Sequence, residues 1–209
     1  MKDVTFFESI NISPPVNKIY TRLGYREGLT HLGDQQKKQV EESIEKALSL
    51  IQLKGAGSIY QIESNDSNQV VLAEGIIFKS QKLAKFLNGS FESLIIAATA
   101  GQDIVDAIVE NSSSDNLTLG VVLDAVASEM TDAGLQWIMN YYGTLLKRER
   151  KTITQKRFSA GYGDFDIINQ KAIYDLLNLE RIGLTLSPNY ILSPEKSVTA
   201  VAGIIKLEN

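Results

Sequence analysis

The stretch of residues 116–151 contains no proline, and its apolar side chains recur at intervals of three or four positions. These apolar positions are Leu119, Val122, Val126, Met130, Trp137, Tyr141 and Leu145. The spacing places them on one face of an α-helix, so the stretch predicts one long helix or two abutting helices. The aromatic side chains of Trp137, Tyr141 and Tyr142 are expected to pack in the core rather than to surround a cofactor.

Shorter elements flank this stretch in a mixed order. Helices are predicted after Ser13 as N-cap, after Asp34 as cap, over residues 81–87, behind Gly101, and over residues 168–177. Strands are predicted over residues 58–63, 70–78, 94–99, 184–186, 190–192 and 198–205. The unbroken apolar run at 94–99 is typical of a buried central strand. The order favours an α+β fold with a mixed or antiparallel sheet and one long central helix, in a single domain covering residues 1–209.

Composition and charge exclude several classes of site and partner. The chain has no cysteine, which excludes disulfides, thiolate zinc sites and cysteine nucleophiles. Its formal net charge of −4 argues against general nucleic-acid binding, because neutralising phosphates requires a basic face. We find no secretory leader and no run approaching the ~18 apolar residues of a membrane span, so a cytoplasmic protein without a membrane segment is expected.

One short segment carries several residue types suited to ligand binding. It reads Arg157-Phe158-Ser159-Ala160-Gly161-Tyr162-Gly163-Asp164. Arginine can hold a carboxylate through two parallel hydrogen bonds, glycine lets the backbone approach a ligand, and tyrosine offers a flat face and a hydroxyl. These groups suit an amino-acid-bearing nucleotide. The segment also fits a simple tight turn between helices, with Asp166 as N-cap and Arg157 at the surface.

Other candidate residues have plainer interpretations. His31, the only histidine, lies in a polar loop and is expected at the surface. Thr99-Ala100-Gly101-Gln102-Asp103 links a buried strand to a helix N-terminus, a common ligand position, but it contains neither a P-loop lysine nor a G-x-G-x-x-G pattern. The basic cluster at residues 147–157 is either a solvated helix C-terminus or a docking patch for an acidic partner.

Several motifs occur together in the order of one known family. Arg157-x-x-x-Gly161-Tyr162 resembles the signature with which the activation domain of cobalamin-dependent methionine synthase binds S-adenosylmethionine. The other matching segments are Leu23-Gly24-Tyr25-Arg26, Ala97-Ala98-Thr99-Ala100-Gly101, Leu123-Asp124-Ala125-Val126-Ala127-Ser128, Ala172–Leu177, Ile182–Leu186 and Lys196–Ala200. The likeness runs from about Leu23 to Ile205. The sequence departs from the synthase domains at Gly163, where they usually carry proline, and it lacks their insertion before the arginine.

The resemblance implies a site and a role. The site consists of Arg157, Ala160, Gly161, Tyr162 and Gly163. Arg157 would hold the methionyl carboxylate, Gly161 would give backbone access, and Tyr162 would pack beside the corrin. The family's acidic ligand contact on the long helix has two candidates, Asp132 and Asn140, between which the sequence does not choose.

In this family, S-adenosylmethionine and a flavodoxin-like reductant restore inactive cobalamin. The sequence lacks the cobalamin-ligating D-x-H-x-x-G pattern around His31. The chain is therefore expected to be an activation subunit, not a complete enzyme. It would act on cobalamin held in trans by a methionine synthase. The alternative is a non-catalytic binding or assembly module for another corrinoid protein. An independent methyltransferase is less favoured, because no general base other than Asp164 or Asp166 lies near Arg157.

Overall fold

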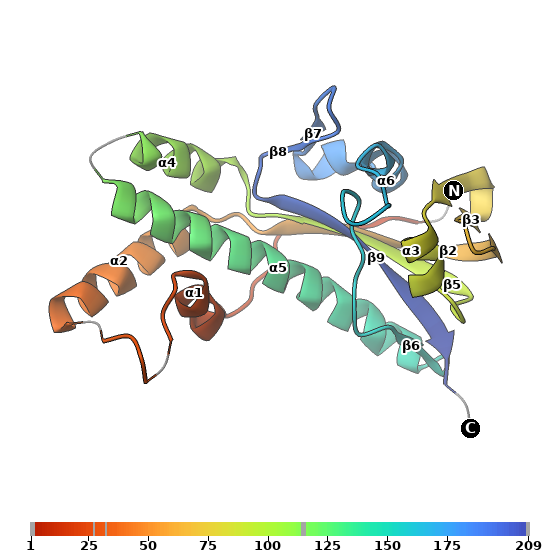
Figure 1. Ribbon diagram of the computed structural model, residues 1–209, viewed down its shortest axis with the longest axis horizontal. Helices are drawn as coiled ribbons and strands as arrows, with labels where there is room; N and C mark the ends of the chain where they lie inside the picture. Colours follow the sequence, from red (N-terminus) through yellow and green to blue (C-terminus); the bar gives the residue numbers. More distant parts are fainter. Residues whose placement is uncertain (1–2, 27, 32, 114–115, 208–209) are drawn as a thin grey trace.

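The long helix α5 (Leu117–Lys147) crosses one face of a curled antiparallel sheet in the computed structural model of the protein (Figure 1). The structure describes residues 3–26, 28–31, 33–113 and 116–207. α5 is one uninterrupted helix of 31 residues, which corresponds to a length of about 46 Å. The sequence therefore predicted this element correctly, and of the two alternatives the single helix is found. The fold is α+β, as expected.

Every strand pair in the sheet is antiparallel. Within the described residues the strand order is β4-β3-β2-β5-β9-β6, and β1 also pairs with β2. These strands are β1 (Thr5–Phe7), β2 (Lys54–Asn65), β3 (Gln69–Leu72), β4 (Ile76–Lys79), β5 (Glu92–Thr99), β6 (Lys151–Ile153) and β9 (Ser197–Lys206). A separate hairpin consists of β7 (Thr185–Leu186) and β8 (Leu192–Ser193). The register of β2 shifts between Ile62 and Ser64, where the strand passes from β5 to β3 as its partner.

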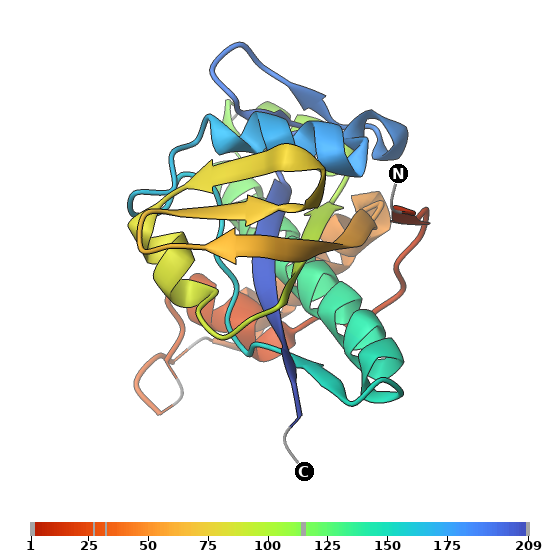
Figure 2. The same cartoon turned by 90° about the vertical axis from the view of Figure 1, so that its right-hand side faces the viewer.

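The remaining helices cover the two faces of the sheet. α1 (Val16–Arg22), α2 (Asp34–Leu50) and α4 (Gln102–Ser112) contribute to the same apolar cluster as α5. α3 (Gln81–Phe86) and α6 (Asn169–Leu177) contribute to a second cluster on the opposite face. Figure 2 shows α6 lying across the strands on the side away from α5. The sheet is thus the middle of three layers.

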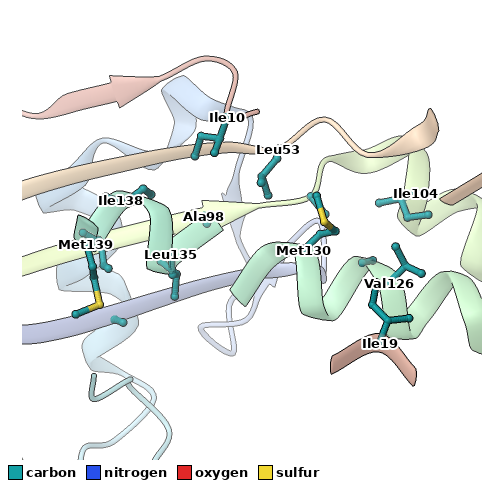
Figure 3. Packing of buried hydrophobic residues seen from close by; sticks show 14 of the residues in the cluster. Ile10, Ile19, Leu53, Ala98, Ile104, Val126, Met130, Leu135, Ile138 and Met139 are labelled. Atoms are coloured by element: carbon teal, nitrogen blue, oxygen red, sulfur yellow. The ribbon is translucent and has the colours of Figure 1, made fainter. Parts of the chain in front are cut away.

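Side chains of β5 alternate between the two apolar clusters. Leu94, Ile96 and Ala98 face α5, whereas Ile95 and Ala97 face α6. All five side chains are fully buried, so the run that the sequence marked as a central strand is covered on both faces. Figure 3 shows the α5 side of this core, where apolar side chains of α5 meet those of α1, α4 and the sheet.

Some local predictions were wrong. The expected strand at 70–78 is a hairpin of β3 and β4, because Glu74 and Gly75 adopt positive φ angles of 68° and 76° and turn the chain back. Ser13 does not cap α1, which begins after Pro15, and Asp34 is the first residue of α2 rather than its cap.

Two further expectations also need correction or lie outside the described part of the chain. The strand expected from residue 190 begins only at Leu192. Ser114, Asp115 and Leu32, the last of which is next to His31, lie outside the described residues. In the part of the chain that the structure describes, no helix combines the length and apolar character needed to cross a bilayer.

Candidate functional site

The Arg157 segment extends the edge of the sheet toward the middle of α5. Phe158 exchanges two backbone hydrogen bonds with Val201 of β9, at 2.8 and 2.7 Å. The Ser159 hydroxyl donates to the carbonyl of Thr199 at 2.7 Å. These bonds fix the backbone immediately after residue 157. Arg157 reaches from this edge to α5.

The Arg157 guanidinium forms an ion pair with the Asp132 carboxylate of α5. Its other terminal nitrogen donates to Gln136 Oε1 at 3.4 Å. Asp132 and Gln136 are four residues apart and therefore lie on one face of the helix. The Arg157 side chain is 20% exposed and that of Asp132 is 45% exposed. The arginine is therefore largely covered, contrary to the surface position expected for a simple turn residue.

A cavity of about 370 Å³ opens beside this ion pair. It is lined by Asp132, Leu135, Arg157, Phe158, Ser159, Tyr162 and Val198. The Leu135 side chain is buried, whereas Tyr162 is 70% exposed, so one aromatic ring is available to solvent at this cavity. The cavity has one cation, one carboxylate and apolar walls. Such a lining suits a ligand with a zwitterionic end and a less polar body.

The predicted site residues divide into two groups. Arg157 and Tyr162 line the cavity. Ala160 does not, because its side chain is buried in the apolar cluster beneath α6. The Gly161 N–H donates to the Phe165 carbonyl at 2.7 Å, which commits that donor to the turn. Gly163 faces Lys82 of α3, and a Cβ built on it would lie 2.6 Å from Lys82 Cδ.

The turn after Tyr162 is held by one buried aromatic residue. Gly161 and Gly163 both have positive φ angles, 89° and 63°, which glycine adopts without a steric penalty. Phe165 closes the turn by donating its N–H to the Tyr162 carbonyl at 3.0 Å. Its ring is fully buried and lies 5.2 Å from the ring of Phe78, centroid to centroid. Because the Phe165 ring is anchored in the core, the turn leaves the Tyr162 side chain exposed to solvent.

Asp164 has a structural role rather than that of a general base. Its carboxylate accepts hydrogen bonds from the Ser80 hydroxyl at 2.5 Å and from the Gln81 and Lys82 N–H groups at 2.8 and 3.2 Å. These are the first N–H groups of α3, which otherwise lack partners. Asp166 likewise accepts from the Ile168 N–H at 3.0 Å, while Ile168 itself occupies the N-cap position of α6. The expectation that Asp166 caps α6 was therefore wrong by two residues.

The Asp164 contacts predict a pH-dependent contribution to stability. The Ser80 hydroxyl and then the backbone donors of α3 hold the pKa of Asp164 below its ordinary value of 3.8. A carboxylate with a lowered pKa stabilises the fold above its unfolded-state pKa, and this stabilisation is lost as the pH falls through the folded-state pKa. The free energies of unfolding of wild type and Asp164→Asn, measured by urea denaturation, should therefore differ at pH 6, and the difference should shrink progressively as the pH falls below about 4. A difference that persists at the lowest pH would contradict this assignment.

Asp132 is the site residue that the sequence did not select. Both Asp132 and Asn140 were candidates for the acidic contact on the long helix, and the structure places Asp132 against Arg157. The signal in the sequence was a row of polar residues at four-residue intervals along α5: Ser128, Asp132, Gln136, Asn140 and Thr144. That row marks the open face of the helix, and the Arg157 segment is packed against part of it.

The other candidate positions have structural partners. The Thr99 hydroxyl accepts from the Gly101 N–H at 3.1 Å and from the Ser197 hydroxyl at 2.8 Å, so the turn before α4 is packed internally. His31 is exposed, as expected. Within the basic cluster, Lys151 pairs with Glu92 and Glu149 at 3.0 and 2.7 Å. In the described part of the chain, no group of three or more acidic or histidine side chains could hold a metal ion.

Comparison with known proteins gives a likeness in structure alone. No family model matches the sequence, and no curated protein matches it. Among solved structures, the chain is similar to the MetH reactivation domain bound to AdoHcy, with a TM-score of 0.68. The match covers 97% of this chain and 78% of that chain, at 11% sequence identity. The chain therefore has the fold of the MetH reactivation domain.

Proposed function

We propose that this chain, folded like the MetH reactivation domain, binds S-adenosylmethionine in the cavity beside Arg157. The observation that carries the proposal is the Arg157–Asp132 pair at the wall of a ligand-sized cavity. It stands where the R-x-x-x-G-Y segment meets the long helix. The solved domain of the same fold is bound to AdoHcy, the demethylated form of this ligand.

The ion pair matches the two charges of an amino-acid end. The Arg157 guanidinium and the Asp132 carboxylate neutralise each other in the ion pair. A bound amino acid would place its carboxylate on the planar edge of the guanidinium and its ammonium on Asp132. The number of ion pairs then rises from one to two, and no charge is left without a partner. Tyr162 offers its exposed ring to the remainder of the ligand.

The role that follows is reactivation of a cobalamin enzyme. We infer that the chain presents S-adenosylmethionine to cobalamin held in trans by a cobalamin-dependent methionine synthase. The sulfonium supplies the methyl group and leaves as S-adenosylhomocysteine, while a flavodoxin-like donor supplies one electron to the inactive corrinoid. The residues of this chain would orient the ligand: Arg157 and Asp132 hold its amino-acid end, and the anchored turn at Phe165 fixes Tyr162.

A second function has one observation in its favour. Gly163, which stands where the synthase domains usually carry proline, lies against Lys82 of α3 and not at the cavity. A turn serving only to join α3 to the sheet edge would fit a non-catalytic module that assembles with another corrinoid protein. In that case the Arg157–Asp132 pair would be a structural contact.

Titration calorimetry with AdoHcy tests the binding step. We expect saturable binding with one site per chain. The cellular role is tested separately, by adding the protein to a methionine synthase that lacks its own activation domain and measuring reductive reactivation. Binding without reactivation would favour the second function. Reactivation that proceeds equally well without this chain would exclude the role in trans.

A further inference from the structure

Basic side chains gather at the end of the molecule where α5 ends. Six of the 21 lysines and arginines of the chain lie within residues 147–157, and Glu149 is the only acidic residue among them. The end of α5, the strand β6 and the end of β9 meet there, at the opposite end of the molecule from α2 and α4 (Figure 1). Four exposed cations of this region form no ion pair within the described part of the chain: Lys147, Arg148, Lys156 and Lys206. We call these four residues the basic edge.

A solvated helix C-terminus accounts for only half of the basic edge. Lys147 and Arg148 lie at the end of α5, where the helix dipole favours cations. Lys156 lies in the segment that follows β6, and Lys206 is the last residue of β9. The dipole effect is confined to the last turn of a helix, so it does not explain these two lysines.

Lys206 lies directly opposite another lysine in the sheet. It is the register partner of Lys151 in the antiparallel pair of β6 and β9. The two ammonium groups lie over the Phe91 ring, 5.5 and 5.2 Å from its centroid. Like charges directly opposite each other destabilise a sheet. Lys151 is neutralised by Glu92 and Glu149, whereas Lys206 has no carboxylate partner among the described residues. The fold itself therefore has no use for the charge of Lys206.

Exposed leucines accompany the basic edge. Leu145 is 42% exposed, and Leu207, directly after Lys206, is 50% exposed. The Leu207 N–H donates to the Arg150 carbonyl at 2.8 Å, which ties the end of β9 to the turn that follows α5. Protein interfaces combine apolar contacts with a polar or charged rim. This end of the molecule therefore has the composition of a protein-binding surface.

We propose that the basic edge docks an acidic face of the protein that holds the cobalamin. Lys156 directly precedes Arg157, so a partner seated on the basic edge also adjoins the proposed ligand cavity. The chain as a whole has a formal net charge of −4, so the basic edge gives one end of it the opposite sign. Such a charge distribution orients an acidic partner and speeds its association. The identity of the partner rests on the proposed function.

Charge reversal tests the proposal through the rate of association, measured by surface plasmon resonance with a methionine synthase that lacks its own activation domain. Lys206→Glu should lower the association rate constant about threefold, and Arg148→Glu with Lys206→Glu about tenfold, with little change in the dissociation rate. Raising the salt concentration from about 50 to about 500 mM should slow wild type far more than the double variant, because salt screens the attraction. Lys38→Glu, at a lysine of α2 whose side chain is 78% exposed, is the matched control for Lys206→Glu.

Folding and ligand binding are measured on the same variants. Lys206→Glu should keep the midpoint of thermal unfolding within about 2 °C of wild type, because removing the like charge opposite Lys151 offsets the lost contact with Phe91. The affinity for AdoHcy, measured by calorimetry, should not change. A variant that associates more slowly only because it also unfolds, or loses AdoHcy, would contradict a docking role.

The remaining outcomes separate docking from the proposed function. If the synthase associates equally fast with wild type and the variants, the basic edge is not the docking surface and the proposed function stands. If the synthase docks through the basic edge but AdoHcy does not bind, the docking surface stands and the ligand site is wrong. If the synthase does not bind even wild type, the docking surface and the role in trans are both overturned. If wild type self-associates at low salt and the double variant does not, a second copy of the chain is the occupant and the proposal is wrong.

Discussion

Replacing Arg157 by alanine is expected to lower the affinity for AdoHcy by roughly ten- to a hundredfold. The change removes a charge-assisted contact to the ligand carboxylate, worth about 1.5–3 kcal/mol. It also leaves Asp132 without its cation, so that the remaining carboxylate repels that of the ligand. Calorimetric titration of wild type and Arg157→Ala measures the effect.

Two further variants decide whether the arginine binds ligand or only supports the fold. Arg157→Lys should recover little affinity, because an ammonium cannot reproduce the planar fork. Asp132→Asn keeps a hydrogen-bond acceptor near Arg157 but loses the charge that would meet the ligand ammonium, so AdoHcy should again bind more weakly. Equal affinities in wild type and all three variants would make the pair a structural contact and would favour the assembly module.

Phe165→Ala is expected to lower the free energy of unfolding by about 3–5 kcal/mol. The ring is fully buried, and its centroid lies 5.2 Å from that of Phe78 and 6.2 Å from that of Phe158. Truncation leaves a cavity between the sheet and the turn that carries Tyr162. Because domains are stable by only about 5–15 kcal/mol, this loss is a large fraction of the total. Urea denaturation monitored by circular dichroism measures it.

Tyr162→Ala is the matched control in the same turn. Its side chain is 70% exposed, so its removal should change the free energy of unfolding by less than about 0.5 kcal/mol. A similar cost for both variants would mean that the turn is not anchored through Phe165. A cost below about 1 kcal/mol for Phe165→Ala would contradict the cavity argument.

The sequence predicted those elements whose patterns are local. α5 and β5 were both found, because an unbroken helical period and an unbroken apolar run each report directly on burial. The sequence predicts a single strand where the structure has the hairpin of β3 and β4, because the run from 70 to 78 is apolar on both sides of Gly75. The left-handed conformation of Glu74, which turns the chain, is unusual for glutamate and gives no signal in the sequence.

The sequence predicted the residues that the Arg157 segment contributes to the site, but not the residue that α5 contributes. Arg157 and Tyr162 belong to a contiguous motif, and both line the cavity. Asp132 lies 25 positions earlier, and only the packing of the sheet edge against α5 brings it to Arg157. The same tertiary packing decides that Ala160 is buried and that Gly163 faces α3. Neighbouring residues of one motif therefore lie at different places in the fold. Their residue types alone do not indicate which of them line the cavity.

The Arg157–Asp132 pair would make the cavity selective against ligands that carry only one of the two charges of an amino acid. With a zwitterionic ligand, every protein charge would still have a counter-ion. Arg157 would pair with the ligand carboxylate in place of Asp132, and Asp132 would pair with the ligand ammonium in place of Arg157. A decarboxylated analogue offers only an ammonium, and a deaminated analogue offers only a carboxylate. Either one separates the pair and leaves one protein charge partly desolvated without a counter-ion, which is costly. Selectivity for intact amino acids would thus come from the cost of separating an existing pair, as much as from the contacts that the ligand gains.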